Sequence, residues 1–206
     1  MSEVRLLPCG ERAMLAEVDD LAAVLGLHAA LEAAGLDGVV ELVPAARTVL
    51  IAFDPARTDA TAVGSEVRAL DWRPGAREDG PLVEVPVRYD GEDLDDVASL
   101  AGISREEVVR RHLAGSYVAA FCGFAPGFAY LDGLDPALRV ARRDSPRTRV
   151  PAGSVAIADR FGAVYPRESP GGWQLLGRTS LSLWDVTADP PARLVPGTRV
   201  RFVEAE

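Results

Sequence analysis

The chain has 206 residues, of which 48% are hydrophobic, and its formal net charge is −9. The apolar content is sufficient for a packed core and excludes a disordered chain, and the negative charge argues against non-specific binding to nucleic acid. None of the 22 basic residues is a lysine, so a Schiff-base lysine, a P-loop lysine and a biotinylated lysine are excluded from this chain.

The first part of the chain predicts four short strands and two helices. In chain order these are strands 4–9 and 13–18, a helix over 21–34, strands 39–43 and 48–53, and a helix over 59–70. Asp19 or Asp20 is positioned to cap the first helix, and Gly35 to end it. His28 lies on the apolar stripe of that helix, where a packed histidine is expected rather than a ligand. Together these elements indicate a small α/β sandwich with its helices on one face of the sheet.

A segment rich in glycine, proline and charge, residues 72–81, is the best linker candidate. We therefore predict one domain over residues 1–78 and a second over 82–206. The second begins with a strand over 82–89, which Pro86 marks as an edge strand. Two helices follow at 93–101 and 104–113, and Ser104 with Glu107 forms a capping-box pattern. The short strands and turns that follow predict a small barrel, so the fold class is α+β.

Compartment and cofactors follow from what the sequence contains. Two cysteines far apart do not indicate a disulfide scaffold, and two histidines with two scattered cysteines lack the spacing of a metal site. No apolar run approaches the roughly 20 residues that span a bilayer, and residues 1–12 lack the apolar core of a signal peptide. We expect a cytoplasmic protein that does not bind membranes and carries neither a metal nor a covalent cofactor.

Residues 121–179 concentrate glycine, proline, arginine and aromatic residues between short apolar runs. Such segments either shape a binding surface on a rigid scaffold or form the tight corners of a barrel. Seven arginines against two aspartates lie between Arg139 and Arg167. This basic segment predicts an anion site or a docking face, with a solvated charged face as the alternative.

Three motifs in this stretch resemble the KipI/allophanate hydrolase subunit 1 family, which includes the B subunit of 5-oxoprolinase. They are GFAPGFAYL at 123–131, PRTRVPAGSVAIA at 146–158 and YPRESPGGWQLLGRT at 165–179. The resemblance extends outward from them over essentially the whole chain. It implies a ferredoxin-like N-terminal domain followed by a cyclophilin-like barrel.

The second and third motifs supply candidate substrate-binding residues. Arg147 and Arg149 would share a face of an extended segment and either grip a carboxylate or phosphate or pair with acids of the same chain. Backbone amides at two glycines can form an anion-binding nest, a tryptophan offers an apolar plate, and a glutamine amide can read a lactam or ureido group. The full candidate set is Arg147, Arg149, Ser154, Tyr165, Gly171, Gly172, Trp173 and Gln174.

Catalytic residues are not identifiable from the sequence, and His112 and Glu168 are the candidates. Glu168 would act as a base only if burial raised its pKa. His112 lies at the end of a predicted helix, where we expect a positively charged imidazolium that organises the site rather than transfers a proton. Phe124, Pro126 and Phe128 surround a Pro-Gly turn, which is either a buried barrel wall or a pocket lip or partner contact.

The resemblance implies a subunit of an ATP-dependent 5-oxoprolinase, which opens 5-oxo-L-proline to L-glutamate and is inactive alone. The implied partners are a second cyclophilin-like subunit, similar to allophanate hydrolase subunit 2 or to the C subunit of 5-oxoprolinase, and a LamB/YcsF-type subunit. ATP would be bound in the assembled complex. Two alternatives remain: a carboxyltransferase subunit of the allophanate hydrolase or urea carboxylase type, and an inhibitor of a sensor kinase. A genomic neighbour would separate them.

Overall fold

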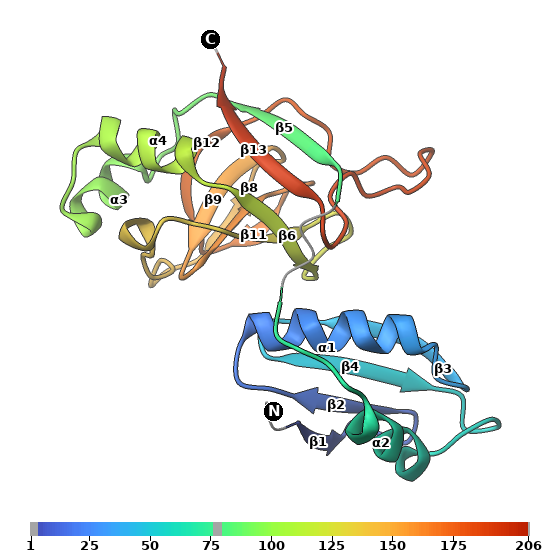
Figure 1. The fold of residues 1–206 in the computed structure, drawn as a ribbon. Coiled ribbons are helices and arrows are strands. Elements are labelled where there is room, and N and C mark those ends of the chain that lie inside the picture. Colours follow the sequence, from blue (N-terminus) through green and yellow to red (C-terminus); the bar gives the residue numbers. More distant parts are fainter. Residues whose placement is uncertain (1–3, 76–79, 206) are drawn as a thin grey trace. The chain divides into compact units, whose positions relative to one another are not determined.

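The computed structural model describes residues 4–75 and 80–205. The chain divides into two compact units, residues 1–77 and 78–206 (Figure 1). The predicted linker at 72–81 lies around this division, and its residues 76–79 are outside the described residues. Among the described residues, no helix has the length and apolar character needed to cross a membrane.

The first unit is a four-stranded antiparallel sheet with two helices, in strand order β1-β2-β4-β3. The elements are β1 (Arg5–Pro8), β2 (Ala13–Glu17), α1 (Leu21–Ala34), β3 (Val39–Pro44), β4 (Thr48–Phe53) and α2 (Ala60–Ala69). Every element predicted for this part of the chain is present. β4 lies between β2 and β3, which α1 connects. The mixed α+β class is confirmed, and the ferredoxin-like class stays a prediction.

Local sequence signals account for the helix ends of this unit. Asp20 caps α1 by accepting a hydrogen bond from the Ala23 amide at 2.8 Å, and Gly35 ends the helix with a left-handed φ of 55°. Alternate side chains of β2 and β4 are buried and pack with apolar residues of both helices in one cluster. The sheet therefore buries one face under α1 and α2, as period-two patterning predicts.

The second unit is a seven-stranded sheet in the order β12-β9-β10-β7-β6-β13-β5, with a two-stranded ribbon β11-β8. Its strands are β5 (Leu82–Val87), β6 (Tyr117–Cys122), β7 (Ala129–Asp132), β8 (Arg147–Val150), β9 (Ser154–Ala158), β10 (Phe161–Val164), β11 (Ser169–Gly171), β12 (Gln174–Arg178) and β13 (Arg199–Glu204). β5, which contains Pro86, is an edge strand of this order and pairs with β13. The edge position predicted from Pro86 is thus confirmed.

A backbone bridge joins the two edges of the seven-stranded sheet. Just beyond β5, Arg88 exchanges two backbone hydrogen bonds of 2.9 Å with Arg178 at the end of β12. The sheet is therefore nearly closed into a barrel, which agrees with the barrel expected from the short strands. The cyclophilin-like class itself stays a prediction.

Two helices and one short 3₁₀ helix accompany this barrel: α3 (Leu94–Ala101), α4 (Arg105–Ala114) and η1 (Pro136–Leu138). α3 and α4 lie side by side, α3 against β12 and α4 against β13 (Figure 1). Ser104 caps α4 by accepting a hydrogen bond from the Glu107 amide at 3.2 Å. The cap predicted from the Ser-x-x-Glu pattern is confirmed, whereas the Glu107 carboxylate pairs with Arg110 and Arg111.

Candidate functional site

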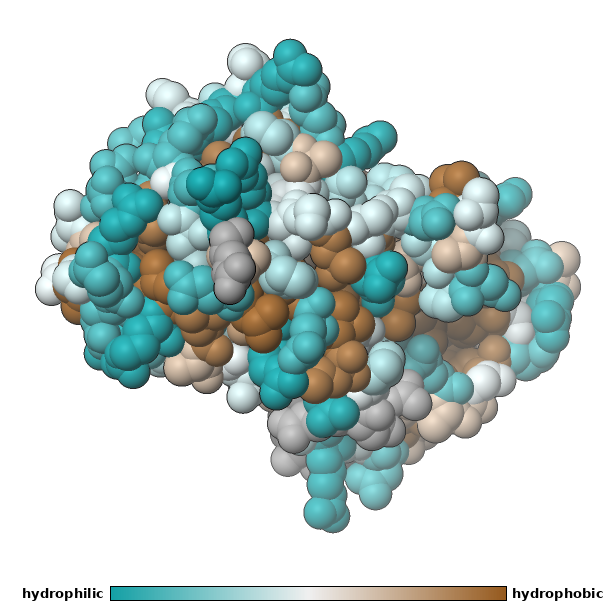
Figure 2. All heavy atoms as spheres, turned by 90° about the horizontal axis from the view of Figure 1, so that it is seen from above, coloured by the Kyte–Doolittle hydropathy of each residue, from teal (hydrophilic) through white to brown (hydrophobic). Residues whose placement is uncertain are grey.

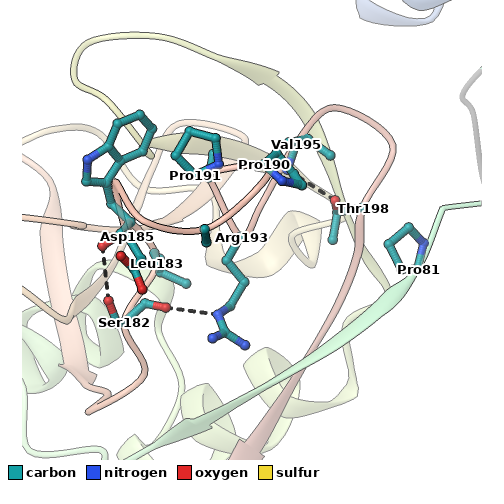
Figure 3. Close-up of a pocket in the computed structure, with 12 residues that line it drawn as sticks. Pro81, Ser182, Leu183, Asp185, Pro190, Pro191, Arg193, Val195 and Thr198 are labelled. Atoms are coloured by element: carbon teal, nitrogen blue, oxygen red, sulfur yellow. Dashed lines mark hydrogen bonds between the residues drawn. The ribbon is translucent and has the colours of Figure 1, made fainter.

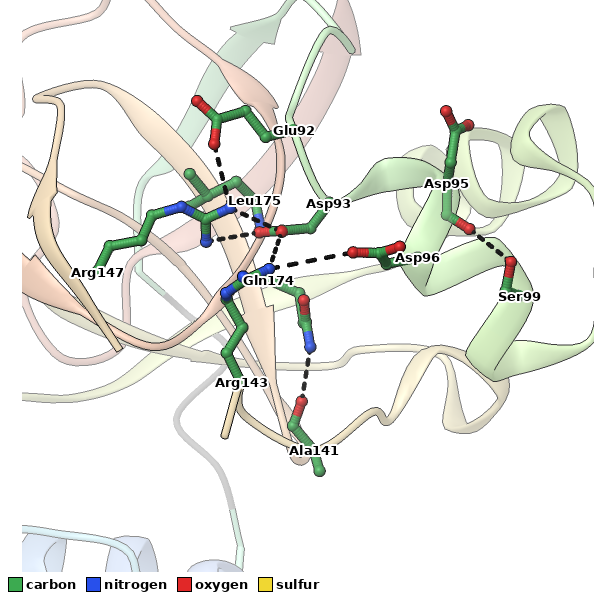
Figure 4. A network of polar contacts seen from close by, with 10 residues as sticks. All are labelled: Glu92, Asp93, Asp95, Asp96, Ser99, Ala141, Arg143, Arg147, Gln174 and Leu175. Carbon is green, nitrogen blue, oxygen red and sulfur yellow. Dashed lines mark hydrogen bonds and ion pairs between the residues drawn. The ribbon is translucent and has the colours of Figure 1, made fainter. Parts of the chain in front are cut away.

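One buried carboxylate connects α3, β8 and β12. Asp93, which is 1% exposed, accepts a bidentate pair from Arg147 at 2.7 and 2.9 Å. It also accepts hydrogen bonds from Arg143 Nη1 at 2.5 Å and from the Leu175 amide at 2.7 Å. Figure 4 shows these groups converging on Asp93. We call Asp93, Arg143, Arg147 and the Leu175 amide the Asp93 network.

The Asp93 network holds its carboxylate in the charged form. Burial alone would raise the pKa of Asp93, but the hydrogen bonds from Arg147 and Leu175 and the two guanidinium charges outweigh burial and lower that pKa. Asp93 precedes α3 without capping it through its side chain. Its carboxylate is used instead to join segments that are 54 and 82 residues away along the chain.

A cavity of about 450 Å³ opens beside this network. It is lined by Asp96, Ser99 and Leu100 of α3, by Arg143, Asp144 and Ser145 of the segment before β8, and by Gln174 of β12. Gln174 donates from Nε2 to the Ala141 carbonyl at 3.1 Å, which fixes the orientation of its amide. The buried atoms Gln174 Oε1 and Arg143 Nε have no hydrogen-bond partner within the described part of the chain.

Arg147 and Arg149 both pair with acids of this chain, which is the alternative left open by the sequence. The side chain of Arg147 is 18% exposed and bound to Asp93, with Glu92 at 3.2 Å. The side chain of Arg149 is 75% exposed and pairs with Glu168 at 2.6 Å. Their shared strand therefore does not bring the two guanidiniums onto one ligand.

Three further candidate residues lie in or next to the β8–β11 ribbon. Glu168 is exposed and pairs with Arg149, so the burial that a general base would require is absent. Gly171 opposes Arg147 in the ribbon, and the Gly172 carbonyl accepts a hydrogen bond from the Arg143 amide at 2.8 Å. Neither glycine has the positive φ that an αR-αL anion nest requires. Gly172 instead helps to position Arg143.

Three candidate aromatic residues share a buried cluster with one another. Trp173, Tyr165 and Phe128 are all nearly inaccessible and belong to one apolar cluster. Phe128 contacts the rings of Tyr165 and Trp173 edge-to-face, with centroids 5.3 and 5.7 Å apart. Burial raises the pKa of Tyr165. These rings fill the interior of this part of the barrel rather than a ligand surface.

The remaining candidates lie apart from the Asp93 network. Phe124 is 60% exposed with a φ of 66°, and Pro126 is also exposed. Phe128 is buried, so the turn combines a barrel-wall residue with an exposed lip. Ser154 is buried and donates its hydroxyl to the Pro151 carbonyl at 2.8 Å. Figure 2 shows hydrophobic side chains exposed among hydrophilic ones over the face it presents.

His112 corrects an expectation drawn from its position in the last turn of α4. The side chain is fully buried, and burial lowers the pKa of His112 from 6.5 to about 3, so it is neutral rather than an imidazolium. Its Nδ1 is 2.7 Å from the Tyr89 hydroxyl. The centroid of its ring is 4.4 Å from the ring centroid of Phe202. Desolvation outweighs terminal-dipole stabilisation, because α4 turns this residue into the core.

A second cavity, of about 350 Å³, lies under the segment between β12 and β13 (Figure 3). Leu183, Trp184 and Pro191 are among its lining residues. Arg193 Nε donates to the Ser182 carbonyl at 2.9 Å and stabilises this segment. None of the residues predicted to bind substrate lines this cavity. Among the described residues, no group of three or more His, Cys, Asp or Glu is placed to hold a metal ion.

Two residues of the site carry no clear signal in the sequence. Asp93 is expected there only as the start of a helix, and Arg143 only as one of seven arginines in a basic segment. Asp93 and Arg143 are 50 residues apart in the sequence, and no local sequence pattern indicates that they are in contact. The signal available is chemical: a basic segment inside an acidic chain needs carboxylate partners from elsewhere.

Comparisons with known proteins agree with this architecture. The family model described as carboxyltransferase domain, subdomain C and D, matches residues 4–194. The B subunit of 5-oxoprolinase from Escherichia coli O157:H7 is 40% identical over 172 residues, covering 82% of this chain and 79% of that protein. The crystal structure of TTHA0988 superposes with a TM-score of 0.80 at 38% identity, covering 95% of this chain and 40% of that one.

A more distant relative is urea amidolyase of Saccharomyces cerevisiae. It is 28% identical over 203 residues, which cover 80% of this chain and 11% of that protein. This chain therefore spans only part of the larger relatives that it matches. The resemblance to the KipI/allophanate hydrolase subunit 1 family, with the B subunit of 5-oxoprolinase among its members, is confirmed. The chain belongs to the family described as carboxyltransferase domain, subdomain C and D.

Proposed function

We propose that this chain is a subunit of an ATP-dependent 5-oxoprolinase, which opens 5-oxo-L-proline to L-glutamate. The observation that carries the proposal is the 40% identity to a protein named as the B subunit of 5-oxoprolinase, over most of both chains. The site adds chemical support. The substrate is a lactam that bears a carboxylate, and the cavity beside the Asp93 network combines a guanidinium with an amide.

The chain works together with other subunits in this proposal. The two catalytic candidates from the sequence are poorly placed for proton transfer, because His112 is neutral in the core and Glu168 is an exposed ion-paired carboxylate. With no lysine in the sequence, any phosphate-binding lysine must come from another polypeptide. The partners are a second cyclophilin-like subunit and a LamB/YcsF-type subunit, and ATP is bound in the assembled complex.

A carboxyltransferase role in urea breakdown is the second candidate, favoured by the similarity to a urea amidolyase. The identity to the urea amidolyase is 28%, lower than the 40% identity to the B subunit of 5-oxoprolinase, so this role is the second candidate. In that role biotin would arrive on another chain, since this chain has no lysine to carry it. The third alternative is an inhibitor of a sensor kinase. In that role the chain would bind a kinase and would not turn over a substrate.

The experiment is reconstitution of the complex from co-expressed subunits, followed by assays with 5-oxoproline, urea and allophanate, each with and without ATP. We expect glutamate from 5-oxoproline only when ATP is present, and no product from the purified chain alone. Bicarbonate- and biotin-dependent turnover of urea would move the assignment to the carboxyltransferase role. Full ATP-dependent activity from the single chain would contradict the proposal that the chain requires other subunits.

A further inference from the structure

We propose that the cavity between α3, the segment before β8 and β12 binds a small acid that carries an N–H group next to its carboxylate. Arg143 holds the carboxylate and Gln174 accepts from the N–H. The inference rests on the proposed function in one respect: 5-oxo-L-proline, with its lactam N–H beside the α-carboxylate, is the ligand that both groups fit. The cavity volume of about 450 Å³ accommodates a molecule of this size.

Gln174 is prepared to accept a hydrogen bond from a ligand. The residue is 5% exposed, and its Nε2 is committed to the Ala141 carbonyl, so the amide cannot exchange its two ends without facing oxygen with oxygen. Its Oε1 is thereby left buried, with no partner in residues 4–75 and 80–205. A buried acceptor without a partner is unfavourable, and this cost is recovered if a ligand donates to it.

Arg143 presents the complementary group. Its Nη1 is bound to Asp93, and its main chain is held by the Gly172 carbonyl, so the guanidinium has a defined orientation. Nε is buried and has no partner among the described residues. Nε and the neighbouring Nη2 form the side edge of a guanidinium, which binds carboxylates through two parallel hydrogen bonds. An anion in the cavity would complete this edge.

Charged groups of both signs surround the cavity. Two guanidiniums, Arg143 and Arg147, share the buried carboxylate of Asp93. The side chains of the other nearby acids are exposed: Glu92 lies 3.2 Å from Arg147, Asp96 lies 4.0 Å from Arg143, and Asp144 also lines the cavity. Two guanidiniums therefore share one buried carboxylate, and the remaining acids lie toward solvent. In Figure 4 Gln174 and Arg143 lie next to each other, with the Gln174 nitrogen turned toward Ala141.

This pair of groups selects by chemistry rather than by shape. Urea has N–H groups but no carboxylate and would leave the Arg143 edge empty. Allophanate also carries a carboxylate beside an N–H, so it shares the recognised feature and must be tested separately. A lactone acid has the carboxylate but no N–H and would leave Gln174 Oε1 unpaired, which we expect to weaken binding strongly.

The test is calorimetric binding to the 206-residue chain and to the reconstituted complex. The probes are 5-oxo-L-proline, its lactone analogue 5-oxotetrahydrofuran-2-carboxylate, pyrrolidin-2-one and allophanate. We expect 5-oxoproline to bind at least about tenfold more tightly than the lactone or pyrrolidin-2-one, since each lacks one of the two recognised groups. Equal affinity for the lactam and the lactone would overturn the role of Gln174.

Variants assign the contacts to residues. Arg143→Gln should weaken 5-oxoproline binding about tenfold to a hundredfold and leave the weak binding of pyrrolidin-2-one unchanged. Gln174→Leu should abolish the preference for the lactam over the lactone. Arg139→Gln, an exposed arginine of the same basic segment outside the cavity, is the matched control. Ser99→Phe fills the cavity from an exposed position of α3, so this variant should fold and should block binding. It tests the cavity even if the Arg143 or Gln174 variant does not fold.

The outcomes separate this inference from the proposed function. Turnover of 5-oxoproline with an unchanged KM in the Arg143→Gln and Ser99→Phe complexes would overturn the inference and leave the function standing. Binding that depends on Arg143 and Gln174, in a complex that makes no glutamate, would support the inference and contradict the proposed function. No binding of 5-oxoproline or allophanate to either the chain or the complex would overturn the inference.

Discussion

The Asp93 network and the Arg149–Glu168 pair both join an arginine of β8 to a carboxylate, but in opposite surroundings. Arg147 meets a carboxylate that is 1% exposed and also binds a second arginine and a backbone amide. Arg149, two residues further along the same strand, meets an exposed glutamate at the solvent side of the ribbon. The energetic weight of an ion pair depends on these surroundings. The first pair organises a site, and the second contributes little.

The largest effect should come from removing the carboxylate at the centre. We expect Asp93→Ala to lower the free energy of unfolding by about 3 kcal/mol, because it leaves two guanidinium groups and the Leu175 amide without their acceptor. Denaturant titration at neutral pH measures this loss. Asp96→Ala, an exposed acid 4.0 Å from Arg143, is the control and should change the free energy by less than about 1 kcal/mol. Equal losses in the two variants would contradict the central role of Asp93.

His112 should make stability depend on pH in a defined window. The unfolded chain protonates this histidine below pH 6.5, whereas the folded chain does so only near pH 3. The unfolded state binds more protons between these values, so the free energy of unfolding falls as the pH falls, by about 1.4 kcal/mol per pH unit.

A comparison of variants isolates this contribution. His112→Leu removes the titration, and the pH slope between about 6.5 and about 4 should be shallower in the variant by that amount. Denaturant titrations at several pH values measure both slopes. Parallel curves for the wild type and the variant would show that the imidazole is not buried as a neutral group.

Much of the fold is predictable because its signals are local. The caps at Asp20 and Ser104, the left-handed Gly35 and the edge position of Pro86 each depend on neighbouring residues, and each is confirmed. The site is predictable only in part. Gln174 is singled out by its chemistry, but Asp93 looks like an ordinary residue before a helix. Its partners are brought to it by barrel closure, and that long-range pairing has no signature in spacing or periodicity.

Two adjacent glycines provide a smaller and sharper contrast. A Cβ on Gly171 would lie 2.2 Å from the Tyr165 hydroxyl, whereas one on Gly172 would lie 3.6 Å from Pro146, an ordinary contact. Tyr165 is buried and packed against Phe128, so its ring cannot easily move aside. We expect Gly171→Ala to cost about 1–3 kcal/mol of stability and Gly172→Ala to remain within about 0.5 kcal/mol of the wild type. Thermal and denaturant unfolding compare the two, and the reverse order would contradict the packing described.

The most direct measurement of the contrast between the two arginine pairs is a pair of double-mutant cycles on the free energy of unfolding. One cycle combines Asp93→Ala with Arg147→Ala, and the other combines Glu168→Ala with Arg149→Ala. We expect a coupling energy of about 2 kcal/mol in the first, from a bidentate contact at a buried carboxylate, and between 0 and about 1 kcal/mol in the second, from an exposed pair. A coupling below about 0.5 kcal/mol between Asp93 and Arg147, or an equal coupling in both cycles, would contradict the view that Asp93 organises the site.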